Sequence, residues 1–146
     1  MKCDIQEYRD PNRAAVCSLL ATIYRDDGAQ ADRLMAFYSK SPERHITTKI
    51  ALIENRVVGQ ANMWRWRKPD SATLGYHVHP DYRRHGIATA LCNAALQAAK
   101  VGGLKEVYIL THASNEASIS VARHLGFRTT AIDAEENNLI GFVLSL

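Results

Sequence analysis

The distribution of apolar and polar residues changes from helical at the start of the chain to β-type in the middle. Pro11 and Asn12 supply the chemistry of a helix start for residues 13–24, and a second helical stretch covers residues 30–38. From residue 46 onward, β-rich runs follow one another through short turns, as in an antiparallel meander. The expected strands are residues 46–53, 57–66 and 71–78, with a weakly alternating strand before them at residues 3–8.

Two turns divide this meander. Glu54-Asn55-Arg56 is typical of a hairpin in which Asn55 tolerates a positive φ. Lys68-Pro69-Asp70 is rich in turn-forming residues and is expected to separate the second and third strands.

Helices and strands alternate in the second half of the chain. Ile87, Leu91 and Ala98 lie on one face of a predicted helix over residues 87–101, which Gly102 ends. The elements expected after it are strands at 105–111, 127–132 and 139–144 and a helix from Ser114-Asn115-Glu116 to about Leu125, with Gly126 as its left-handed cap. The pattern predicts an α/β or α+β sandwich built on one central sheet.

Composition limits the class of protein without naming a reaction. With 146 residues, 47% hydrophobic and 23% charged, the chain is expected to form a single domain over residues 1–146. No apolar run approaches the roughly 18 residues of a membrane-spanning helix, and the first residues lack a signal-peptide pattern, so we expect a cytoplasmic protein without membrane contact. Three distant cysteines, Cys3, Cys17 and Cys92, suggest neither a disulfide framework nor a zinc site. A net charge of +3 suits an anionic ligand but falls short of a nucleic-acid-binding surface.

The most informative segment is the basic loop between the strand ending at Val78 and the helix beginning at Ile87. A helix N-terminus offers unpaired N–H groups and the positive end of the helix dipole, and both attract phosphate. Gly86 lets a ligand oxygen approach the backbone, while Arg83 and Arg84 add positive charge. The glycine patterns of kinase-type and dinucleotide-binding loops are absent from the chain. On local physics alone the segment is either an anion site or a solvated basic turn.

Two motifs resemble those of the GNAT superfamily of acetyltransferases. Arg83-Arg84-His85-Gly86-Ile87-Ala88 is similar to the family's [QR]-x-x-G-x-[GA] pyrophosphate signature. It follows the lead-in Val78-His79-Pro80-Asp81-Tyr82, which is typical of that family. About forty residues later, Asn115-Glu116-Ala117-Ser118-Ile119 and then Leu125-Gly126-Phe127 look like its second CoA-contacting motif. The N-x-x-S form with Ser118 resembles the branch that acetylates ribosomal-protein N-termini.

This resemblance implies a GNAT-like fold, in which a mixed sheet of six to seven strands is flanked by about four helices and splayed between strands 71–78 and 105–111. Acetyl-CoA would lie in that gap, with no metal required. The backbone near Tyr76 and Val78 would pair with the pantetheine arm and polarise the thioester carbonyl, and loop amides would take the pyrophosphate. The implied cofactor-binding residues are Tyr76, Val78, Arg83, Arg84, His85, Gly86, Ile87, Ala88, Thr89, Asn115 and Ser118.

The residues that would move protons do not follow from the resemblance. The positions where relatives carry an acid or base correspond here to Ala72, Leu110 and Ala122, none of which is ionisable. His77 is one catalytic candidate, as the acceptor of the amine's proton or else as a structural histidine. Ser118 is the other, as a hydrogen-bond partner of the CoA sulfur region or else as a small residue that the cofactor requires. His77 and His79, two apart on one strand, would also share a face, which leaves a metal pair as an alternative.

The sequence also leaves alternatives for the residues that would bind the acceptor. Trp64 and Trp66 share a face of their strand and either stack on a cationic substrate or belong to the core. Asp26, Asp27 and Asp32 either attract a polyamine, an aminoglycoside or a basic peptide, or form a solvated acidic loop. We therefore expect direct acetyl transfer from acetyl-CoA to a primary amine of a small molecule or peptide in a ternary complex, by an enzyme that is a candidate homodimer. The alternative is a catalytically weak sensor that binds acyl-CoA.

Overall fold

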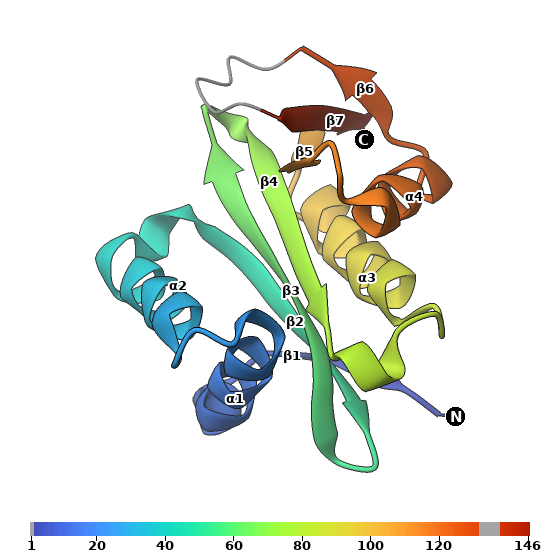
Figure 1. The fold of residues 1–146 in the computed structure, drawn as a ribbon. Coiled ribbons are helices and arrows are strands. Elements are labelled where there is room, and N and C mark those ends of the chain that lie inside the picture. The colour runs from blue at the N-terminus through green and yellow to red at the C-terminus, as the bar shows by residue number, and fades with distance from the viewer. Residues whose placement is uncertain (1, 132–137) are drawn as a thin grey trace.

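The computed structural model describes residues 2–131 and 138–146. Within these residues seven strands form one mixed sheet in the order β1-β2-β3-β4-β5-β7-β6 (Figure 1). The strands are β1 (Asp4–Glu7), β2 (His45–Ile53), β3 (Arg56–Trp66), β4 (Lys68–Val78), β5 (Glu106–His112), β6 (Arg128–Thr130) and β7 (Leu139–Ser145).

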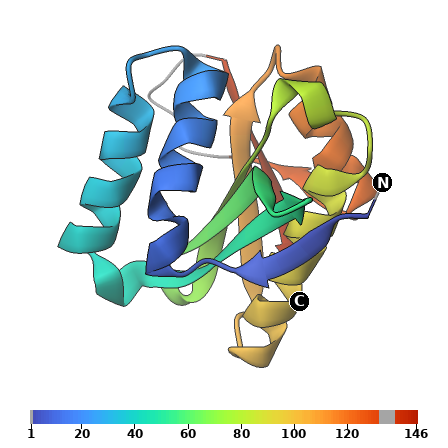
Figure 2. The same ribbon diagram turned by 90° about the horizontal axis from the view of Figure 1, so that it is seen from below.

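Helices cover both faces of the sheet, so the molecule has three layers (Figure 2). On one face lie α1 (Arg13–Tyr24) and α2 (Ala29–Lys40), and on the other lie α3 (Ile87–Val101) and α4 (Glu116–His124). Short 3-10 turns precede α1, β2 and the α3 loop at η1 (Asp10–Asn12), η2 (Pro42–Arg44) and η3 (Pro80–Tyr82). This arrangement agrees with the predicted sheet and helices.

Each face of the sheet has its own apolar core. The α3 side buries Leu91 and Phe142, and the α1 side buries Leu20 and Ile50. Helix α3 lies close to β3 because Gly59 has no side chain: a Cβ at this position would be 2.9 Å from Leu91 Cδ1. Strand β4 lies between the two cores, so one of its faces contacts α3 and the other contacts α1.

Strands β4 and β5 pair in parallel over three residue pairs only, from Ser71 with Glu106 to Thr73 with Tyr108. Beyond Thr73, β4 continues to Val78 along β3, while β5 continues to His112 along β7. The sheet therefore opens between β4 and β5, as the family resemblance implied.

Local signals were confirmed at most turns. The hairpin between β2 and β3 has Glu54 and Asn55 at φ of 50° and 63°. Asn115 caps α4 by accepting a hydrogen bond from the Ser118 amide, and Gly126 has a φ of 90°. The last predicted strands shift slightly: β6 is shorter than residues 127–132, of which Ile132 lies outside the described residues, and β7 extends to Ser145.

The prediction of a turn at Lys68-Pro69-Asp70 was wrong. Trp66 pairs directly with Lys68, and Arg67 makes the reversal alone with a φ of 63°. Pro69 is tolerated inside β4 because it has no paired residue in the register with β3 or in that with β5, so its missing N–H breaks no ladder bond.

Candidate active site

The two faces of β4 separate two chemically different environments. Ala72, Leu74, Tyr76 and Val78 pack into the core on the α3 side. Because successive strand residues alternate, Thr73, Gly75 and His77 point to the side of α1 and α2. One strand thus connects both halves of the site.

The edge of β4 that faces the gap presents backbone amides. The His79 amide donates to the Val58 carbonyl at 2.8 Å, which fixes the alternation of the β3–β4 ladder. The amides of Leu74, Tyr76 and Val78 consequently point away from β3, toward β5. The Val78 carbonyl on the same edge accepts a hydrogen bond from Arg83 Nε at 3.2 Å. An extended ligand in the gap would meet a strand edge with its donors and acceptors in place.

The loop before α3 has the backbone geometry of an anion site. Arg84 and Gly86 have φ of 66° and 74°, and Gly86 is the N-cap of α3 with no side-chain hydrogen bond to the helix. The amides of the first turn, including Ile87 and Thr89, are thus open to a ligand. The predicted residues Arg83, Arg84, His85 and Gly86 are exposed, and Ala88 is half-buried. The structure brings these residues together at one helix end.

The second motif meets β4 on this same side. The Tyr76 hydroxyl lies 2.7 Å from Ser118 Oγ and donates to the Ser118 carbonyl at 3.1 Å. Burial raises the pKa of Tyr76 to about 12, although the Ser118 contact opposes the shift. The phenol is therefore protonated at neutral pH. The sequence predicted both residues as cofactor contacts but gave no sign that they touch.

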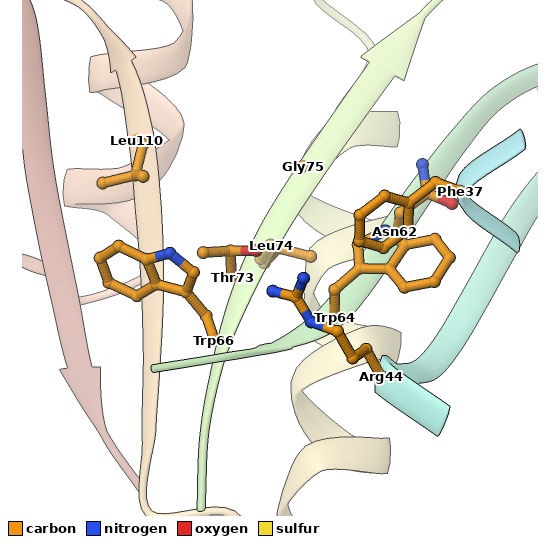
Figure 3. Close-up of a pocket in the computed structure, with 9 residues that line it drawn as sticks. All are labelled: Phe37, Arg44, Asn62, Trp64, Trp66, Thr73, Leu74, Gly75 and Leu110. Atoms are coloured by element: carbon orange, nitrogen blue, oxygen red, sulfur yellow. The ribbon is translucent and has the colours of Figure 1, made fainter. Parts of the chain in front are cut away.

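A pocket of about 470 Å³ opens on the other side of β4, at the point where β4 and β5 separate (Figure 3). Its floor includes Gly75 of β4 and Leu110 of β5. A Cβ added to Gly75 would meet no atom within 4 Å. The lining residues are Phe37, Arg44, Asn62, Trp64, Trp66, Thr73, Leu74, Gly75 and Leu110.

Aromatic side chains form the walls of this pocket. The ring of Trp64 lies edge-on to Phe37, with centroids 4.3 Å apart, and Trp66 lies edge-on to Tyr108 at 5.0 Å. Both tryptophans are half-buried. Both line the pocket, which does not fit the core alternative from the sequence, and stacking on a cationic substrate stays a prediction.

Sequence reasoning missed Asn62, which lines the pocket and is 6% exposed. Its Oδ1 accepts hydrogen bonds from the Tyr38 hydroxyl at 2.7 Å and from Thr48 Oγ1 at 2.9 Å. Burial raises the pKa of Tyr38 to about 12, so that hydroxyl is a donor. The signal available in the sequence was a polar residue within a run of strand residues that are otherwise mostly apolar.

The imidazole ring of His77 is enclosed by neighbouring side chains. Its Nε2 lies 2.5 Å from the Tyr24 hydroxyl, and its Nδ1 lies 2.6 Å from Gln60 Nε2. Burial, with a smaller effect of the Arg83 guanidinium, lowers the pKa of His77 to about 4, so the ring is neutral at neutral pH. Both ring nitrogens are engaged by protein, and the pocket lining does not include this residue. Its role as base stays a prediction, and Tyr24 and Gln60 are neighbours that the sequence did not reveal.

His79 does not share a strand with His77, because β4 ends at Val78. Its Nδ1 accepts from the Asp81 amide at 3.1 Å, and its ring packs against Tyr82. Within residues 2–131 and 138–146, no group of three or more His, Cys, Asp or Glu side chains is placed to hold a metal ion.

The acidic loop has a local structural role. Asp26 Oδ2 accepts a hydrogen bond from the Gln30 amide at 3.1 Å at the start of α2. Asp26, Asp27 and Asp32 are not among the residues that line the pocket. This favours a structural and solvated loop over an acceptor-binding one.

Known proteins share both the sequence pattern and the fold of this chain. The model of the family described as "Acetyltransferase (GNAT) family" matches residues 13–127. A Salmonella typhimurium protein solved with its cofactor acetyl-CoA superposes with a TM-score of 0.79 at 20% identity, over 98% of this chain and 93% of the other. The ribosomal-protein-alanine N-acetyltransferase from Brucella melitensis gives 0.80 at 17% identity, over 98% and 99%. The PaiA N-acetyltransferase from Thermoplasma acidophilum, in complex with coenzyme A, gives 0.79 at 15% identity, over 100% of both chains.

The fold and the family match define an enzyme of the acyltransferase class. The chain belongs to the Acetyltransferase (GNAT) family. The structural neighbours, all at or below 20% identity among those named, show a shared fold. No helix among the residues that the structure describes is long and apolar enough to cross a membrane.

Proposed function

We propose that this enzyme transfers an acetyl group from acetyl-CoA to a primary amine by direct attack in a ternary complex. The observation that carries the proposal is the opening between β4 and β5 beyond Thr73, with the uncapped first turn of α3 on one side and a pocket on the other. A long thioester can enter from the α3 side and present its reactive carbonyl to the pocket. The amine then approaches from the side of α2.

The residues present fit acetyl-CoA as co-substrate. The exposed loop from Arg83 to Gly86 and the uncapped first turn of α3 suit the pyrophosphate. The β4 edge supplies the amides of Leu74, Tyr76 and Val78, so a pantetheine amide pairs as an added strand would. One of these N–H groups would polarise the thioester carbonyl.

For the proton balance, we assign the donor role to the Tyr76 hydroxyl, positioned by Ser118. The amine nitrogen bonds to the carbonyl carbon, the C–S bond breaks, and the departing sulfur takes the Tyr76 proton. The proton released from the amine passes to water, and water reprotonates Tyr76. Burial keeps Tyr76 protonated, and Ser118 holds the hydroxyl at the start of α4. This fills a role for which Ala122, fully buried, has no suitable group.

Release of free CoA thiol from acetyl-CoA, measured with a panel of primary amines, tests the proposal. We expect amine-dependent release together with the acetylated amine in the product. A protein that acetyl-CoA stabilises against heat, but that releases no thiol with any amine, would be the acyl-CoA sensor instead. Stabilisation by ATP and not by acetyl-CoA would contradict both functions.

A further inference from the structure

The described residues that line the pocket beside β4 carry positive charge and no negative charge. Among its described lining residues, Arg44 carries the only formal charge, and neither aspartate nor glutamate is present. An amine acceptor is itself a cation before it loses its proton. A pocket built for a polycation would present carboxylates, and this one presents a guanidinium.

Arg44 is held so that part of its guanidinium remains available. Its Nε and Nη2 donate to the Arg65 carbonyl at 3.3 and 3.1 Å, and its Cζ lies 5.4 Å from the centre of the Phe37 ring. A guanidinium has five N–H donors in a fixed plane, so two bonds to one carbonyl leave the far end unused. That end extends between Trp64 and the Thr73–Leu74 segment of β4 (Figure 3). It matches the two oxygens of a carboxylate.

The surroundings strengthen this preference. Arg67 stacks over Trp66, with its Cζ 4.1 Å from the ring centre. The β3–β4 turn thus adds positive charge beside the pocket. An anionic group on the substrate is attracted to this end, and a second ammonium group is repelled.

The rest of the lining is mainly apolar. Phe37, Trp64, Trp66 and Leu110 form walls that would accommodate an aromatic or branched hydrocarbon group. A volume of about 470 Å³ is in the range of a small-molecule site. The pocket therefore combines an apolar wall, one anion anchor and an open route to β4 at Gly75.

We propose that the acceptor is a small amino carboxylate with an apolar side group, and that Arg44 binds its carboxylate. This inference rests on the proposed acetyl transfer and narrows its substrate class. It separates the candidates that the sequence left open, since polyamines and aminoglycosides lack a carboxylate and carry several positive charges.

Matched acceptors test the role of the carboxylate. L-Phenylalanine, L-phenylalaninamide and 2-phenylethylamine share one ring and one amine, and only the first has a carboxylate. Rates of thiol release are compared per neutral amine, because the three ammonium groups differ in acidity. We expect kcat/KM to be at least about tenfold higher for L-phenylalanine, as charge-assisted hydrogen bonds at an arginine would give. L-Leucine and 3-methylbutylamine form a second pair, and spermidine represents the polycations.

Arg44→Gln removes the anchor and keeps a shorter, uncharged polar side chain. We expect this variant to lose the preference for the carboxylate, so that the ratio of kcat/KM for L-phenylalanine to kcat/KM for 2-phenylethylamine falls toward one. Arg67→Gln is the graded control, because it removes the same charge at a residue outside the pocket lining and should lower the preference far less than Arg44→Gln does. Binding of N-acetyl-L-phenylalanine to the CoA complex, measured by calorimetry, should weaken strongly in Arg44→Gln and only slightly in Arg67→Gln.

Other outcomes contradict the inference in distinguishable ways. Equal kcat/KM for the acid and the amide, faster reaction with spermidine, or an equal loss for all acceptors in Arg44→Gln would overturn the substrate class and leave acetyl transfer intact. Thiol release with none of the amines would overturn the proposed function itself, and this inference with it.

Discussion

The site uses different groups on the two sides of β4: mainly backbone on the α3 side and mainly side chains on the α2 side. On the α3 side the site consists mainly of backbone: a loop with left-handed residues at Arg84 and Gly86, the open first turn of a helix, and a strand edge. On the α2 side it consists mainly of side chains from five elements, including Phe37 of α2, Arg44 of η2 and Trp64 of β3. The first side suits a ligand common to a whole family, and the second suits a ligand particular to one enzyme.

This difference predicts that the two sides can be damaged separately. Changes at the loop should act on acetyl-CoA affinity, whereas changes in the pocket should act on the acceptor. Tyr76 and His77, neighbours on β4 that point to opposite sides, should differ in the same way.

Filling the pocket should have the largest effect. Gly75→Phe places a ring where the structure leaves open space, so we expect kcat/KM for the amine to fall by at least about 100-fold through a displaced acceptor. Gly75→Ala is the graded control, with a smaller loss. Steady-state kinetics and calorimetry with CoA measure the two sides, and an equal loss of CoA affinity would break the comparison.

Tyr76→Phe should lower kcat by about 100-fold, the lower end of general acid catalysis. It removes the hydroxyl that contacts Ser118 and leaves the ring in the core. Ser118→Ala should give a smaller loss, because the hydroxyl remains but is less well positioned. The distinguishing readout is an acetyl thioester with a more acidic thiol, which should restore much of the Tyr76→Phe rate. A deficit independent of the thiol would mean that Tyr76 is structural.

His77 should make the stability of the fold pH-dependent. Its pKa is about 4 in the folded chain against 6.5 unfolded, so the unfolded state takes up a proton first as the pH falls. The free energy of unfolding should therefore decrease by about 2 kcal/mol between pH 6.5 and pH 4. Urea titrations should show a flatter profile in His77→Gln, whereas the exposed His124→Gln should follow wild type. Parallel profiles for His77→Gln and wild type would show that the enclosure of His77 is wrong.

Gly86→Ala should have the smallest of these effects, and the effect should be limited to acetyl-CoA binding on the α3 side. Its φ of 74° strains any other residue, and a methyl group stands where the pyrophosphate would approach, so we expect about tenfold weaker acetyl-CoA binding. Gly103→Ala is a matched control at the other end of α3, with a φ of 78° and the same open surroundings. Both variants should lose similar stability. Equal acetyl-CoA affinities in the two would remove the loop from the binding site.

The sequence revealed the backbone-built side well, because short local patterns determine its geometry. A glycine before a helix and an Asn-x-x-Ser helix start can be recognised within a few residues of each other, and the structure places them as expected at Gly86 and Asn115. The error at Lys68-Pro69-Asp70 has a local cause too, since one left-handed arginine, Arg67, shortened the turn.

The acceptor side was less predictable because its residues meet only through sheet register. Tyr24 and His77 are 53 positions apart, and Arg44 reaches the Arg65 carbonyl across 21. Trp64 and Trp66 were recognised as candidates, but no local pattern gave Arg44 or Gly75. Convergence of distant side chains depends on which strands pair and in which register, and a single sequence does not specify that.

Amide hydrogen exchange with and without acetyl-CoA measures the division of the site most directly. We predict slower exchange at Tyr76 to Val78, in the loop and first turn from Arg84 to Thr89, and at the start of α4. Residues 37–44, which supply Phe37 and Arg44 to the pocket, should change only when an amino carboxylate is added to the CoA complex. Unchanged exchange at Tyr76 to Val78 and at the loop with saturating acetyl-CoA would contradict the placement of the co-substrate between β4 and β5.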